Sequence, residues 1–170
     1  SCTAGSFSTT VSKSSDANYS FTFTQTDPAG NTSDASSAVQ WTRDTSAPDA
    51  PTITTPSVNP LVSNDSTITI GGACTAGFSV VLSGSDSQTT SCSGTGDYAF
   101  SVSKSSDATY SFSVLQKDLA LNASSSVPLT WTRDTVAPDA PVIHPSILDT
   151  TYTAVNSLSL TGDCEAGATV

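Results

Sequence analysis

The sequence repeats itself after 90 or 91 residues. The stretch SKSSDANYSFTF that begins at Ser12 returns as SKSSDATYSFSV at Ser103, and WTRDTSAPDAP at Trp41 returns as WTRDTVAPDAP at Trp131. Near-identity over so long a period is typical of tandem domains and excludes a short-repeat solenoid.

The register of the repeat predicts one whole domain between two parts. We expect residues 1–47 to be the C-terminal part of a repeat, 48–138 a complete repeat, and 139–170 the N-terminal part of the next. A half-domain cannot bury its apolar face and should not be stable alone. Two explanations stay open, and we favour the first: a piece of a long array, or a head-to-tail polymer in which parts of two copies complete each other.

Apolar residues alternate with polar ones within the complete repeat, which is the period of a half-buried strand. Turn-forming residues separate the alternating runs, and no stretch has helical spacing. The runs are Ile68 and Ile70; Val80 and Leu82; Tyr98, Phe100 and Val102; Tyr110, Phe112 and Val114; and Val127, Leu129 and Trp131. With a first strand at Pro51 to Thr54, this predicts an all-β fold of tandem Ig-like Greek-key β-sandwich repeats of about 90 residues.

Three kinds of residue refine this prediction. Trp41 and Trp131 alternate in phase with their neighbours and are expected in the core. Tyr19 and Tyr110 follow a polar corner, where a sandwich often places a tyrosine whose hydroxyl bonds back to the backbone. Pro128 predicts that the last strand is an edge strand, since proline lacks an N–H for the ladder.

Several motifs resemble the bacterial Ig-like repeats of large surface adhesins. They are GGACTAG from Gly71, GDYAFS from Gly96, the DPAGN and DLALN loops from Asp27 and Asp118, and DTVAP from Asp134. The resemblance covers the whole chain and implies extracellular stalk modules that hold a binding tip away from a bacterial surface. It also implies calcium between neighbouring repeats. The two cysteines per repeat depart from many such adhesins.

Cysteine spacing predicts one disulfide per repeat. Cys74 and Cys92 are 18 residues apart in the complete repeat, without a metal-like Cys-x-x-Cys grouping. Zinc is the weaker alternative, because a closed site needs four ligands. Cys2 and Cys164 would lack a partner in their own repeat or would bridge neighbouring molecules. Disulfides suggest export through an oxidising compartment.

Acidic residues gather where the linkers should meet the loops of a sandwich. Several oxygen ligands converging on a linker suit Ca²⁺, which takes six to eight oxygens. The candidate metal ligands are Asp44, Asp49, Asp118 and Asn122 at the first junction, and Asp134, Asp139 and Asp163 with Glu165 at the second. The alternative is ordinary turn chemistry, with Arg43 and Arg133 pairing with the neighbouring aspartates.

Composition excludes several classes of function. Fifteen acidic residues against five basic ones give a net charge of −10, which argues against nucleic acid and anionic membranes as partners. No apolar run approaches a transmembrane helix, so we expect no membrane insertion. The lone His144 belongs to one copy only and supports no catalytic triad. Lys13 and Lys104 are expected to be solvated rather than linked by isopeptide bonds.

The sequence therefore predicts a protein that is no enzyme: a structural stalk or spacer of an extracellular or cell-surface bacterial adhesin or fibre. Its expected partners are neighbouring repeats, copies of itself head-to-tail, and a host or prey surface reached through another region. The alternatives are a fibre subunit that polymerises by completing half-domains and a glycan- or protein-binding Ig-like module.

Overall fold

The computed structural model describes residues 5–144, 157 and 159–170, and this part of the chain contains strands but no helix. The chain divides into two compact units, Ser1–Arg133 and Asp134–Val170. The strands are β1 Ala17–Phe21, β2 Val39–Arg43, β3 Leu61–Ser63, β4 Thr67–Ala73, β5 Ser79–Gly84, β6 Gln88–Ser91, β7 Asp97–Ser103, β8 Ala108–Lys117, β9 Val127–Arg133, β10 Val142–Ile143 and β11 Gly162–Asp163. The predicted division into residues 1–47, 48–138 and 139–170 stays a prediction.

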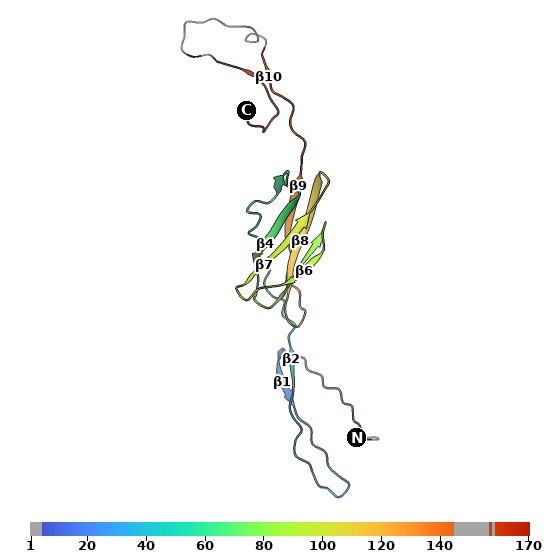
Figure 1. Cartoon of the computed structure of the whole chain (residues 1–170). Helices are drawn as coiled ribbons and strands as arrows, with labels where there is room; N and C mark the ends of the chain where they lie inside the picture. The colour runs from blue at the N-terminus through green and yellow to red at the C-terminus, as the bar shows by residue number, and fades with distance from the viewer. Residues whose placement is uncertain (1–4, 145–156, 158) are drawn as a thin grey trace. The chain divides into compact units, whose positions relative to one another are not determined.

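Strands β3 to β9 form two sheets, coloured green to orange in Figure 1. One sheet has five strands in the order β3-β9-β8-β5-β6, and the other pairs β4 with β7. The pairs are antiparallel except β3 with β9, which is parallel. The fold is thus all-β, and its two sheets are consistent with a β-sandwich.

A single apolar core joins the two sheets. Ile70 on β4, Phe100 on β7, Val114 on β8 and Trp131 on β9 all belong to it. Trp131 is fully buried, and its indole N–H donates a hydrogen bond to the Ser63 hydroxyl. The five alternating runs of the sequence are confirmed as β4, β5, β7, β8 and β9.

The alternation missed two strands of this region, β3 and β6. Strand β6 has the sequence QTTS and contains no apolar residue, so alternation could not reveal it. It lies at an edge of the five-stranded sheet and is defined only by its hydrogen bonds to β5. The predicted first strand at Pro51 to Thr54 is not assigned as a strand. Its backbone nevertheless donates hydrogen bonds from Thr52 to the Ala73 carbonyl and from Thr54 to the Gly71 carbonyl.

The prediction that Pro128 marks an edge strand is wrong, since β9 lies between β3 and β8. Proline is tolerated because the three residues of β3 pair only with Trp131–Arg133. Beside Pro128 the side chain of Asn59 makes the hydrogen bonds that a neighbouring strand would otherwise make. It donates to the Pro128 carbonyl at 3.0 Å and accepts from the Thr130 N–H at 3.1 Å.

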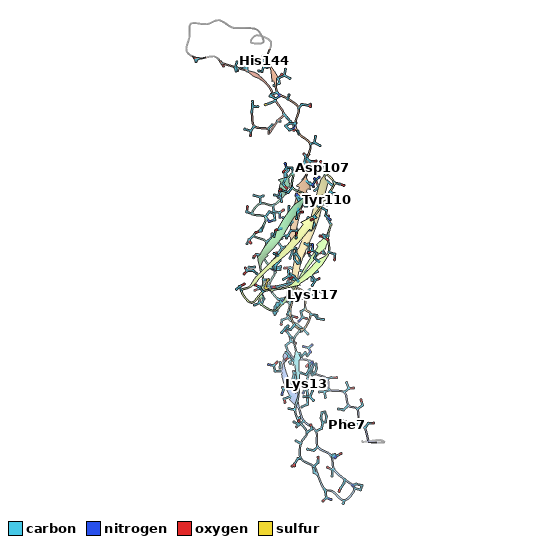
Figure 2. The ribbon with its side chains drawn as sticks, viewed as in Figure 1. Phe7, Lys13, Asp107, Tyr110, Lys117 and His144 are labelled. Atoms are coloured by element: carbon cyan, nitrogen blue, oxygen red, sulfur yellow. A yellow bond between two sulfur atoms is a disulfide. The ribbon has the colours of Figure 1, made fainter. Side chains whose placement is uncertain are left out.

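Both tyrosine corners are confirmed. The Tyr110 hydroxyl donates to the Ser106 carbonyl at 2.8 Å, and the Tyr19 hydroxyl donates to the Ser15 carbonyl at the same distance. In Figure 2, Asp107 and Tyr110 lie at one end of β8 and Lys117 at the other. Lys104 is not simply solvated: its ammonium group donates to the Ser85 carbonyl and lies 5.3 Å from the centre of the Tyr110 ring.

The N-terminal part of unit 1 contains the antiparallel pair β1 and β2. Its register places Tyr19 opposite Trp41, as β8 and β9 place Tyr110 opposite Trp131. The expectation that both tryptophans are core residues is wrong for Trp41, which is 37% exposed whereas Trp131 is 0% exposed. Among the described residues, β1 and β2 form a sheet of two strands, and no further strand covers Trp41 as the strands of the complete repeat cover Trp131.

Candidate functional site

The candidate site is the loop that follows β8, where the linker Asp44–Asp49 enters the complete repeat. Asp118 is buried at the end of β8 and Asn122 closes the loop. One Asp118 carboxylate oxygen accepts from the Asn122 backbone N–H, and the other accepts from the Asn122 side-chain amide, each at 2.9 Å. The loop is therefore locked by its own first and last residues.

The same loop geometry occurs in the N-terminal part of the chain. Asp27 accepts the backbone and side-chain N–H groups of Asn31 at 2.8 and 2.9 Å. The turn residue with positive φ is Gly30 in this copy and Leu121 in the other. Because the first loop is exposed, its conformation arises from local hydrogen bonds and needs no surrounding core.

Two amide side chains of the complete repeat hold the linker. The Asn122 amide donates to the backbone carbonyl of Asp44 at 3.1 Å, and the Gln116 amide donates to the backbone carbonyl of Asp49 at 2.7 Å. The two contacts span 78 and 67 residues of sequence. They fasten the linker at its first and last residue, and we call Gln116 and Asn122 the amide clamp.

Gln116 is only 2% exposed and has partners for its whole side chain. Its amide oxygen accepts from the Thr75 backbone N–H at 2.9 Å, and its amide nitrogen also donates to the Thr75 hydroxyl at 3.2 Å. A buried amide is costly unless it is hydrogen-bonded in this way. Gln116 therefore ties three segments together: β8, the linker and the turn after β4.

Gln116 is a site residue that was not predicted from the sequence, although a signal for it was present. Gln116 continues the inward alternation of Phe112 and Val114 along β8, and Gln25 stands at the equivalent place in the N-terminal copy. A polar residue at a position of a strand where alternation predicts burial indicates a hydrogen-bond partner inside the fold.

The clamp loop also sets the ionisation of Asp118. Burial alone would raise the pKa of the Asp118 carboxyl. The side-chain and backbone N–H groups of Asn122 outweigh burial and hold this pKa below its usual value. The pKa of Asp27 is lowered in the same way by Asn31. Both carboxyl groups are therefore charged hydrogen-bond acceptors at neutral pH.

The predicted calcium ligands do not converge on a common point in the described residues, where no group of three His, Cys, Asp or Glu side chains could hold a metal ion. Asp118 uses both oxygens on Asn122, and one Asp44 carboxylate oxygen accepts the Ser46 backbone N–H. Asp44 and Asp49 meet the loop through their backbone carbonyls. The arrangement does not fit a calcium site, and calcium binding stays a sequence prediction.

At the second junction Asp134 repeats the turn made by Asp44, since it accepts the Val136 backbone N–H at 2.9 Å. Asp163 lies 3.4 Å from the His144 ring nitrogen. Asp139, Asp163 and Glu165 are exposed.

Arg43 and Arg133 do not form ion pairs with the neighbouring linker aspartates, as the alternative to calcium expected, but with other aspartates. Arg43 forms an ion pair with Asp16, and Arg133 forms one with Asp107. The backbone and side chain of Thr45 also donate to Asp16 at 3.0 and 2.8 Å. These hydrogen bonds, with the Arg43 charge, lower the pKa of Asp16. The start of the linker is thus held to the corner before β1.

A disulfide closes the complete repeat next to the clamp. Cys74 and Cys92 are joined, with Cα atoms 5.9 Å apart, and Cys92 is buried. The bond links the turn after β4 with the end of β6. Cys164 is a free, exposed cysteine, whereas Cys2 lies outside the described residues.

No protein-family model matches the chain, and no curated protein matches it either. In the described residues no helix is long and apolar enough to cross a membrane.

Proposed function

We propose that this chain is a segment of a stalk that projects a binding tip from a bacterial surface, built from Ig-like repeats similar to those of large adhesins. The observation that carries the proposal is the amide clamp. Gln116 and Asn122 hold both ends of the linker that enters the complete repeat. A spacer needs junctions of defined geometry, and a linker bound at both ends loses conformational freedom.

The composition of the linker supports the same role. Pro48 and Pro51 fix their backbone φ angles, which stiffens the segment further. The Cys74–Cys92 disulfide limits how far the repeat can extend if it unfolds. A disulfide is consistent with an oxidising compartment, as a stalk outside the cell requires.

In this proposal the chain carries no catalytic activity. Its single histidine, His144, is exposed, follows directly after β10, and lies 3.4 Å from Asp163. Adhesion to a host or prey surface would reside in another region, and the neighbouring repeats are its structural partners. Calcium at the junctions would add stiffness but is not needed for it, because hydrogen bonds already hold the linker.

Single-molecule pulling tests the stalk function. With the chain held by its two ends, the complete repeat should unfold in one cooperative step. The length gained should be roughly 60 Å shorter when the disulfide is intact than after reduction, since the bond withholds 18 residues of about 3.5 Å each. Extension without a resisting step would contradict a stalk.

The rival function, a glycan- or protein-binding module, is tested on the same chain. Immobilised chain should give no signal on a glycan array and no binding to host cells. Specific binding in either assay would favour the rival instead.

A further inference from the structure

The strand that leaves the complete repeat is bound directly to a segment near its entrance. Strand β3 pairs with β9 in parallel, so that Leu61–Ser63 lies opposite Trp131–Arg133. The chain continues from Arg133 into the second linker at Asp134. A ladder of three residues is short, because strands usually have about five or six. Side chains lengthen this ladder at both of its ends.

The Asn59 side chain continues the ladder before β3. In a parallel pair, a residue donates to the carbonyl that precedes its opposite residue and accepts from the N–H that follows that residue. The register of β3 and β9 places Asn59 opposite Leu129. The Asn59 amide donates to the Pro128 carbonyl at 3.0 Å, and its oxygen accepts from the Thr130 N–H at 3.1 Å. These are the two hydrogen bonds that the backbone of a strand would form at this position.

Two side chains of β9 continue the contact at the other end of β3. The Trp131 indole N–H donates to the Ser63 hydroxyl at 3.1 Å. The Arg133 Nε–H group donates to the backbone carbonyl of Asp65, also at 3.1 Å. Hydrogen bonds therefore join residues 59–65 to residues 128–133, and we call these two segments the extended ladder.

Tension along the chain would slide the two segments of the extended ladder past each other. It reaches the repeat through the linker Asp44–Asp49 on one side and reaches β9 through Asp134 on the other. Because β3 and β9 are parallel, these two pulls act on opposite ends of the pair and in opposite directions. Hydrogen bonds across two sliding strands share the force, whereas the bonds of a pair that is peeled from one end break one at a time.

We propose that the side chain of Asn59 bears tension: it adds two hydrogen bonds to the extended ladder and so slows the unfolding of the complete repeat under force. This inference rests on the proposed stalk function, because only a chain under tension uses such a ladder. Bonds that break before the transition state set the unfolding rate, and bonds that are still intact there do not. Since the extended ladder joins the entry side to the exit strand, its bonds break first.

The test holds the chain by its two ends at constant force and measures the lifetime of the complete repeat before it unfolds. Asn59→Ala should unfold about tenfold faster than the natural chain, because it lacks two hydrogen bonds that must break before the transition state. A lifetime equal to that of the natural chain would overturn the proposal. Extension of the natural chain without a resisting step would be a different failure, since it contradicts the stalk function without any substitution.

Gln88→Ala is the matched control, because it also removes an amide that forms two hydrogen bonds. The Gln88 amide donates to the Ser101 backbone carbonyl at 2.8 Å and to the Asp86 carboxylate at 3.0 Å. Gln88 lies on β6, at the opposite edge of the five-stranded sheet from β3. Its hydrogen bonds should still be intact when the extended ladder breaks, so the lifetime under force should stay close to that of the natural chain. An equally short lifetime for Gln88→Ala would overturn the proposal.

Urea unfolding separates the response to force from general stability. Both variants should keep the circular dichroism spectrum of the natural chain and should lose similar amounts of unfolding free energy, since each lacks two hydrogen bonds. Only Asn59→Ala should also have a shorter lifetime under force. If the unfolding free energies of Asn59→Ala and Gln88→Ala differ as much as their lifetimes do, the difference arises from general stability and the proposal is overturned.

Discussion

The side-chain amide of Gln116 donates a 2.7 Å hydrogen bond to the backbone carbonyl of Asp49, which precedes it by 67 residues. Buried at the end of β8, this amide binds the linker where it passes into the complete repeat. The contact makes the path of the linker part of the fold of the repeat. Removing it should affect both stability and the junction.

We expect Gln116→Ala to lower the free energy of unfolding of the complete repeat by about 2 kcal/mol, because it leaves the Thr75 N–H and the Asp49 carbonyl without partners. Urea unfolding followed by circular dichroism measures the change. Gln25→Ala is the matched control in the exposed copy and should leave this transition unchanged. Equal urea midpoints for Gln116→Ala and Gln25→Ala would contradict a stabilising role of the amide clamp.

Leu121→Gly should stabilise the protein. Leu121 has a φ of 70°, and the equivalent residue of the other loop is Gly30 with a φ of 91°. The left-handed conformation costs a residue with a Cβ atom about 1–2 kcal/mol, partly offset by the greater freedom of glycine when unfolded, so a net gain of about 0.5–1 kcal/mol is expected. Leu119→Gly, two residues earlier in the same loop, should bring no gain in the same urea assay.

Acid should weaken the repeat partly through Asp118. The folded-state pKa of this carboxyl is lowered, so its contribution to stability is complete above the unfolded pKa of about 3.9 and is lost as the pH falls through the folded value. Asp118→Asn should therefore be less stable at neutral pH and show a shallower decline below about pH 4. Parallel stability curves for the two proteins on acidification from neutral pH to below about pH 4 would contradict this role.

Breaking the disulfide should cost about 3 kcal/mol, as the chain-entropy relation gives for a loop of this size. The double variant Cys74→Ser with Cys92→Ser tests this in guanidinium unfolding. Cys164→Ser is the control, because Cys164 is exposed and free and its loss should leave the midpoint unchanged. An equal loss in the control would place the stabilisation elsewhere.

A chelator should leave the thermal midpoint of the complete repeat unchanged. The side-chain amides of Asn122 and Gln116 already hold the backbone carbonyls of the linker residues Asp44 and Asp49. The measurement is a calorimetric scan with EDTA and a second scan with added calcium. A midpoint that falls with EDTA and recovers with calcium would instead support the calcium site predicted from the sequence.

The strands of the complete repeat were predictable because burial on one face of a sheet imposes alternation. Ile70, Phe100 and Trp131 follow that period and are buried as expected. Strand β6 was not predictable in this way, since an edge strand of polar residues is defined by its neighbour. Pro128 misled for a related reason: the side chain of Asn59, not solvent, occupies the place beside it.

The contacts between the linker and the loop after β8 were not predictable from composition, and calcium binding at this junction stays a prediction. Composition draws attention to carboxylates, whereas the structure joins the linker through the backbone carbonyls of Asp44 and Asp49 and the amides of Asn122 and Gln116. Which polar atoms meet depends on distances between segments 67 and 78 residues apart, and spacing along the chain does not report them.

The sequence by itself determined the repeat, its strand periodicity, the tyrosine corners and the loops locked by Asp27 and Asp118, because all of these depend on neighbours close in the chain. Only the tertiary structure decided that Gln116 is a buried clamp, that the arginines pair with Asp16 and Asp107, and that Trp41 is exposed while Trp131 is covered. Near-identical local sequence gives different burial of Trp41 and Trp131, since burial depends on strands contributed from distant parts of a chain.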